Sequence, residues 1–179
     1  MRGLVAAAVA MLLGLSPAAA DPQILDEAAI RDCILAAAGV HRVPPAVLVI
    51  LLNVEGGSLG RVSHNTNGTV DIGPMQVNEI WLPELAAHWR TTPPRAYAAL
   101  RDNFCANVEA GAWILRRSLD EPGSDFWDGV GDYHSHNPQH RQAYLRSVLQ
   151  QATRLRDLVA RSPVTTPQVA GDRKESNRE

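Results

Sequence analysis

The sequence predicts a mainly α-helical protein with a single folded domain. Apolar residues recur at steps of three and four in several segments, which is the spacing of one face of a helix. Proline stands near the expected starts of these segments and glycine near their ends. The alternation of apolar and polar residues that is typical of strands is nearly absent. The chain has 179 residues, which leaves enough length for one hydrophobic core.

The first twenty residues have the pattern of a secretory signal peptide. A basic start at Arg2 precedes a nearly unbroken apolar run over residues 4–15, which is too short to span a bilayer comfortably. Three alanines at residues 18–20 match the small-residue pattern that signal peptidase cuts. We therefore expect residues 1–20 to be removed and the protein to be exported to the periplasm; a retained anchor is the alternative.

Helices are predicted over residues 25–38 and 46–55, from 76 or 78 to 87, in a short segment opened by Pro93, and over 103–119, 125–133 and 138–159. The first has apolar residues at helical spacing, and Gly39 is expected to end it. The second follows a proline pair and is apolar on every side except at Asn53 and Glu55. A helix that is apolar all round is a core helix.

Residues 58–74 show no periodicity and are rich in Asn, Ser, Thr and Gly, so they are predicted as a loop with a short hairpin near Asn67 and Gly68. The helix over 103–119 is the strongest amphipathic candidate. Residues 161–179 are too polar to fold and are predicted as a disordered tail. The folded domain is therefore expected over residues 21–160.

Charge and cysteine content restrict the partners and the compartment. The formal net charge is −2 and aromatic residues make up 5% of the chain. Neither a basic surface nor a set of stacking platforms for nucleic acid is therefore expected. Cys33 and Cys105 form an even pair in a chain with an export signal, which favours one disulfide in an oxidising compartment. Two buried free thiols are the alternative.

Glu55 is the most informative single residue, because it is a carboxylate at the end of an apolar helix. Burial disfavours the charged form of a carboxyl group, and the partial negative charge of a helix C-terminus acts in the same direction. A raised pKa is what a general acid needs near neutral pH. The alternative is a helix-end residue that simply turns to solvent.

The residues around and after Glu55 form an ordered set of motifs. Residues 54–57 read Val-Glu-Gly-Gly, residues 65–78 read Asn-Thr-Asn-Gly-Thr-Val-Asp-Ile-Gly-Pro-Met-Gln-Val-Asn, and residues 105–112 read Cys-Ala-Asn-Val-Glu-Ala-Gly-Ala. Together with Tyr133, this order resembles the catalytic core of soluble lytic transglycosylase-like proteins. The closest resemblance is to small members associated with type III and type IV secretion and conjugation, and it covers roughly residues 30 to 155.

The resemblance implies a lysozyme-like domain of the goose-lysozyme type, with a small loop and hairpin lobe over residues 61–76. It implies that Glu55 is the only catalytic carboxylate. Glu55 would protonate the oxygen between N-acetylmuramic acid and N-acetylglucosamine in peptidoglycan, and would then act as base toward the muramic 6-hydroxyl. The product would carry a 1,6-anhydro ring. This scheme differs from the usual pair of carboxylates in glycosidases.

Further site residues follow from the same resemblance. Gln76 would bind sugar or acetamide groups, and Met75 would either line the cleft beside it or pack in the core. Tyr133 would donate a hydrogen bond near Glu55 or the acetamide, or act as a core aromatic residue. Asn78 is expected to cap a helix and position the loop, and His134 to lie on one wall of the cleft.

Two departures from the family pattern affect the expected activity. Gly56 stands where the family usually has Ser, and residues 134–136 read His-Ser-His in place of Asn-x-Gly. A lysozyme-type hydrolase, which would use Glu55 as acid but deliver water to the sugar, is the near alternative. A catalytically weak peptidoglycan-binding assembly factor, with Gly56 marking lost activity, is the distant one. Asp71 is expected to organise a turn, with a second catalytic carboxylate as the alternative.

No cofactor is expected. His134, His136 and His140 have a spacing that zinc can accept, but Pro138 interrupts the helical register, so no metal is predicted there. Peptidoglycan glycan strands are the expected partner, together with components of a type III or type IV secretion or conjugation machine, and the protein is expected to be a monomer. The four tryptophans are expected in the core unless they stack on sugars.

Overall fold

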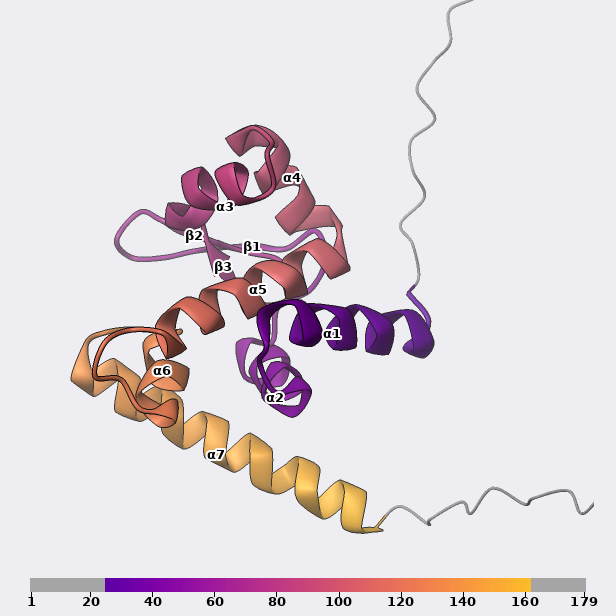
Figure 1. Cartoon of the computed structure of the whole chain (residues 1–179), viewed down its shortest axis with the longest axis vertical. Coiled ribbons are helices and arrows are strands. Elements are labelled where there is room, and N and C mark those ends of the chain that lie inside the picture. The colour runs from indigo at the N-terminus through magenta and orange to yellow at the C-terminus, as the bar shows by residue number, and fades with distance from the viewer. Residues whose placement is uncertain (1–24, 162–179) are drawn as a thin grey trace, which may run out of the picture.

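The computed structural model describes residues 25–161. The predicted signal peptide at residues 1–20 and the tail after Arg161 lie outside the described residues. Within them the chain forms seven α-helices, one short 3-10 helix and a three-stranded antiparallel sheet. The prediction of a mainly α-helical protein is therefore confirmed (Figure 1).

The first two helices are α1 (Glu27–His41) and α2 (Pro45–Glu55). The side chain of Asp26 caps α1 by accepting a hydrogen bond from the backbone N–H of Ala29. The prediction that Gly39 ends α1 is wrong. The helix continues for two more residues to His41, and Arg42 caps it with a left-handed backbone. Val43 follows, and Pro44 after it disfavours a helical backbone at Val43.

The sheet contains β1 (Val62–His64), β2 (Val70–Ile72) and β3 (Val77–Asn78) in that order. The predicted hairpin near residues 67 and 68 is confirmed, because β1 and β2 are antiparallel neighbours on either side of it. The third strand was not predicted, and the predicted helix start at residue 76 or 78 is wrong. Gln76 has a φ of 46°, which no helix can continue, and the next two residues pair with β2.

The 3-10 helix η1 (Glu79–Trp81) leads into α3 (Leu82–His88), which has proline in its first turn. Helix α4 (Pro93–Asp102) also starts at a proline, as predicted. In both helices the missing proline N–H is one that a first turn leaves unpaired. The two helices contact each other and, with the sheet, form one side of the molecule in Figure 1.

Helix α5 (Phe104–Leu119) is the centre of the domain and contacts α1, α2, α4, α6 and β3. It agrees closely with the predicted helix over 103–119, and the side chain of Asn103 caps it. Figure 1 shows the sheet, α3 and α4 on one side of α5, with α6 (Phe126–Asp132) and α7 (Pro138–Arg161) on the other. The apolar core runs through both sides.

A disulfide joins Cys33 in α1 to Cys105 in α5, across 72 residues of sequence. The predicted bond is therefore present, and it ties the first helix to the central one. Such a bond is compatible with an oxidising compartment outside the cytoplasm. Among residues 25–161, no helix alone has the length and apolar composition to span a membrane; α1 and α2 reach both only as a pair bent by 119°.

Candidate active site

Glu55 lies on the buried face of α2. Leu48 and Leu51 on this face have no exposed surface. Glu55 lies four residues after Leu51 and seven after Leu48, which keeps it on the same side of the helix. The helix ends directly after it, where Gly56 has a φ of 60° and its N–H bonds to the carbonyl of Leu52. A glycine suits this left-handed cap better than any residue with a Cβ.

The Glu55 carboxyl group is held by α7. The hydroxyl of Tyr144 donates a hydrogen bond to Glu55 Oε1 at 2.5 Å. Burial raises the pKa of Glu55 from 4.5 to about 7, the hydrogen bond from Tyr144 opposes this rise, and the negative charge of Asp71 adds to it. Glu55 therefore keeps a proton over a pH range in which an exposed glutamate is ionised, and it can also release that proton near neutral pH.

Two further rings pack against the ring of Tyr144. The ring of His134 stacks on the ring of Tyr144, with centroids 4.6 Å apart and an angle of 3° between the planes. The rings of Tyr133 and Tyr144 have centroids 6.5 Å apart and an angle of 28° between their planes. Burial raises the pKa values of both tyrosines above their usual range, so both hydroxyls remain donors. Burial, with a smaller effect of His140, lowers the pKa of His134, which favours a neutral imidazole at pH 7.

Asp71 in β2 is the acidic residue whose charge acts on Glu55. Its two carboxylate oxygens accept hydrogen bonds from the side-chain amides of Asn65 at 2.9 Å and Asn78 at 2.7 Å. Asn78 also accepts a bond from the N–H of Ile80 and so caps η1. These contacts hold the hairpin in place, which agrees with the expected turn-organising role of Asp71 and the capping role of Asn78.

Met75 and its backbone connect the hairpin lobe to α5. The Met75 side chain is fully buried, so it packs in the core, where a Cβ on Gly111 would lie 2.6 Å from its Cε. Its N–H donates to Asn107 Oδ1 at 2.7 Å, and its carbonyl accepts from the Tyr133 hydroxyl at 3.0 Å. Of the two roles considered for Met75, the structure therefore favours core packing. Tyr133 donates to this backbone rather than to Glu55.

Gln76 lies in the turn that packs on the end of α2. Its Nε2 donates to the carbonyl of Gly73 at 2.7 Å. A Cβ on Gly57 would clash with that same carbonyl and would approach Gln76 Nε2 to 2.8 Å. The side chain of Gln76 is therefore next to the residues that follow Glu55. Since glycine at 57 permits this approach, the glycine pair after α2 both ends the helix and admits the turn.

The structure thus brings Glu55, Tyr144, His134 and Tyr133 together and sets the Gln76 turn against the end of α2. Sequence reasoning missed Tyr144. Tyr144 and Val148 are four residues apart, as on one face of a helix, but nothing in the sequence pairs α7 with α2.

A groove of about 480 Å³ runs along the neighbouring face of α2, and Glu55 is not among its lining residues. Trp81, Trp89 and Trp113 pack partly against the core, whereas Trp127 is half exposed.

Neither models of known protein families nor curated protein sequences give a match to this chain.

Proposed function

We propose that the protein is a lysozyme-like lytic transglycosylase that cleaves the bond between N-acetylmuramic acid and N-acetylglucosamine in peptidoglycan. The observation that carries the proposal is the state of Glu55, whose pKa of about 7 suits a group that first gives and then takes a proton. The sequence motifs around it supply the substrate class. The mainly helical fold with its small antiparallel sheet agrees with this class.

The proposed reaction uses Glu55 twice. Protonated Glu55 gives its proton to the glycosidic oxygen, and the bond from that oxygen to the anomeric carbon of the muramic residue breaks. The carbonyl oxygen of the substrate's own acetamide stabilises the cationic centre. The ionised Glu55 then takes the proton of the 6-hydroxyl, whose oxygen bonds to the anomeric carbon and closes the anhydro ring.

A single catalytic carboxylate is consistent with the contacts of Asp71. Both of its oxygens are already bonded to side-chain amides within the hairpin. Such a carboxylate is held for structure rather than presented to a sugar carbon. We therefore assign Asp71 an indirect role, in which its charge contributes to the raised pKa of Glu55.

The decisive experiment is to identify the ends that the purified protein releases from peptidoglycan by mass spectrometry. Anhydro-muramic ends are expected. Reducing ends would show that water attacks instead and would move the protein to the lysozyme-type hydrolases. Binding without any release would reject the enzymatic proposal and favour the assembly-factor alternative, in which Gly56 marks lost activity.

Tyr144→Phe is expected to shift the pH dependence of cleavage. The Tyr144 hydroxyl stabilises the ionised form of Glu55 and lowers its pKa. Without the hydroxyl the pKa should rise, so the alkaline limb of the rate profile should move up by about one pH unit. The pH profile of initial rates measures this shift. Tyr97→Phe in α4 is the matched control and should leave the profile unchanged; an unchanged profile in Tyr144→Phe would contradict the assigned contact.

The proposed site of action is the periplasm, and the disulfide between Cys33 and Cys105 supports export to an oxidising compartment. Cutting glycan strands there would open the wall locally for a secretion or conjugation machine, whose components would be the protein partners.

A further inference from the structure

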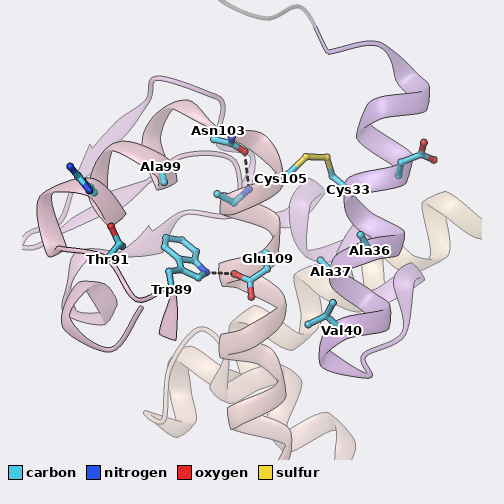
Figure 2. Close-up of a pocket in the computed structure, with 13 residues that line it drawn as sticks. Cys33, Ala36, Ala37, Val40, Trp89, Thr91, Ala99, Asn103, Cys105 and Glu109 are labelled. Atoms are coloured by element: carbon cyan, nitrogen blue, oxygen red, sulfur yellow. Dashed lines mark hydrogen bonds between the residues drawn. A yellow bond between two sulfur atoms is a disulfide. The ribbon is translucent and has the colours of Figure 1, made fainter. Parts of the chain in front are cut away.

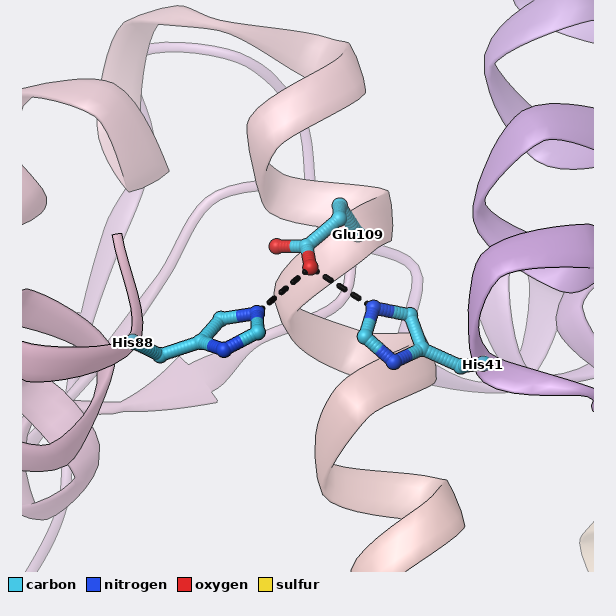
Figure 3. Close-up of side chains that lie close together, drawn as sticks. All are labelled: His41, His88 and Glu109. Carbon is cyan, nitrogen blue, oxygen red and sulfur yellow. Dashed lines mark hydrogen bonds and ion pairs between the residues drawn. The ribbon is translucent and has the colours of Figure 1, made fainter. Parts of the chain in front are cut away.

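Two histidines and a glutamate meet where the C-terminal ends of α1 and α3 approach α5. His41 closes α1, His88 closes α3 and Glu109 lies within α5. Glu109 Oε1 is 2.6 Å from His41 Nε2 and 2.9 Å from His88 Nε2 (Figure 3). The three atoms lie within 4.8 Å of one another. Each imidazole therefore directs its Nε2 atom at the same carboxylate oxygen, Glu109 Oε1.

Neighbouring aromatic residues fix the orientation of this group. Trp89 Nε1 donates a hydrogen bond to the other oxygen of Glu109, Oε2, at 2.6 Å. The ring of His88 stacks on Trp113 with centroids 5.3 Å apart, and His41 is buried. A carboxylate that ligates a metal is usually hydrogen-bonded in turn, and Glu109 has this support from Trp89.

Glu109 borders a groove of about 830 Å³ between α1, the α3–α4 segment and α5, whereas His41 and His88 do not line it. Glu109 and Trp89 line its wall, and the disulfide between Cys33 and Cys105 lies along the same groove (Figure 2). His88 keeps 34% of its side chain exposed. An ion could therefore enter and leave without unfolding the domain.

We propose that His41, His88 and Glu109 bind a zinc ion, with His41 Nε2, His88 Nε2 and Glu109 Oε1 as ligands. Two imidazole nitrogens and one carboxylate oxygen are a donor set that zinc takes in proteins, with water as the fourth ligand. In a tetrahedral site with bonds of about 2.0–2.1 Å, ligand atoms lie roughly 3.4 Å apart. Shifts of about 1 Å or less would bring the three atoms to that separation.

The ion would join the ends of α1 and α3 to the middle of α5. The disulfide already joins α1 to α5 near the other end of the groove, so the metal would be a second, reversible clamp on the same helix. The ligands are 68 and 21 residues apart in sequence, so no short spacing indicates them. The spacing that sequence analysis considered for zinc, at residues 134, 136 and 140, belongs to another part of the fold.

Zinc titration of the purified chain, free of any histidine tag, tests the proposal by calorimetry. One ion per chain is expected, with a rise in Tm of about 5–10 °C when zinc is a hundredfold above its Kd. Co²⁺ in place of zinc should give the visible absorption of a tetrahedral site. Absence of zinc binding by the unaltered chain would overturn the proposal without any variant.

Variants then locate the ion. Glu121, Asp132 and His136 are a second group of described residues with the spacing to hold a metal, so His136→Gln is the matched control for His88→Gln. His88→Gln and Glu109→Gln should each weaken zinc binding at least about tenfold and remove the rise in Tm, whereas His136→Gln should keep both. Loss of binding in His136→Gln with retention in His88→Gln would assign the ion to the second group and reject the proposed site.

Discussion

Glu55→Gln is expected to lower the rate of glycan cleavage about a thousandfold or more. The substitution keeps the size of the side chain and an oxygen for the Tyr144 hydroxyl at the position that now accepts at 2.5 Å, but it removes the proton that the reaction transfers. General acid–base groups contribute about 10²–10⁴-fold to rates, and here one group serves both steps. Release of anhydro-muramic ends from peptidoglycan measures the effect.

Glu84→Gln is the matched control, because Glu84 is an exposed glutamate paired with Arg117 on the surface. It should retain the rate of the unaltered chain. Cleavage by Glu55→Gln at a rate similar to that of Glu84→Gln would show that another group supplies the proton and would reject the assignment of Glu55.

Glu55→Gln should also increase the free energy of unfolding at alkaline pH. A variant that is inactive but more stable has lost the catalytic group and not the fold. The pKa of Glu55 is about 7 in the folded chain and 4.5 without burial. Between these values the folded chain binds a proton that the unfolded chain has released, so this contribution to the free energy of unfolding is present below about pH 4.5 and is lost as pH rises through 7. The loss corresponds to about 3 kcal/mol.

Glutamine has no proton to lose, so Glu55→Gln escapes this loss. The difference in unfolding free energy between variant and unaltered chain should therefore move by about 3 kcal/mol in favour of the variant from pH 4.5 to pH 8. Urea unfolding at several pH values measures it. A constant difference across this range would mean that the pKa of Glu55 is not raised.

Helices were predictable from the sequence where a local pattern, such as amphipathic spacing or a capping residue, determined their bounds. The amphipathic pattern of α5 and its Asn103 cap fixed both position and length, and the glycine pair after Glu55 fixed the end of α2. The error at residues 76–78 occurred where pairing with another strand overrode the local prediction. A helix was predicted to start at residue 76 or 78, but residues 77 and 78 pair with β2 and Gln76 adopts a left-handed backbone.

The candidate site was predictable only in its central residue and in the loop that follows it. The burial of Glu55 at the end of an apolar helix can be inferred from the residues next to it in the sequence, and so can a turn rich in Asn and Gly. The hydrogen bond from Tyr144 joins residues 89 apart, and that separation depends on how α7 packs on α2. The interactions of Asn107 with the hairpin lobe likewise depend on tertiary packing, because they span up to 35 residues.

Asn107→Ala is expected to lower the free energy of unfolding by about 3–5 kcal/mol. Asn107 is fully buried. Its Oδ1 accepts from the N–H of Met75 at 2.7 Å, and its Nδ2 donates to the carbonyls of Ile72 and Leu100, each at 2.9 Å. Alanine leaves three buried backbone groups without these partners, and each such group is costly to leave unpaired.

The effect should reach the candidate site as well as the global stability. Met75 and Gln76 lie within the turn that begins at Gly73, where a Cβ would already approach Asn107 too closely. Loosening this turn should therefore reduce cleavage even at temperatures where Asn107→Ala remains folded. Urea unfolding and cleavage rates, measured on the same preparation, test both effects.

Asn53→Ala supplies the comparison, because Asn53 is an exposed asparagine whose amide donates only to the carbonyl of Val49 in its own helix. Its stability should stay within about 0.5 kcal/mol of the unaltered chain. Equal stabilities of Asn107→Ala and Asn53→Ala would mean that water replaces the amide without loss. In that case the position of the Gln76 turn would depend on the close packing of Met75 against Gly111 rather than on Asn107.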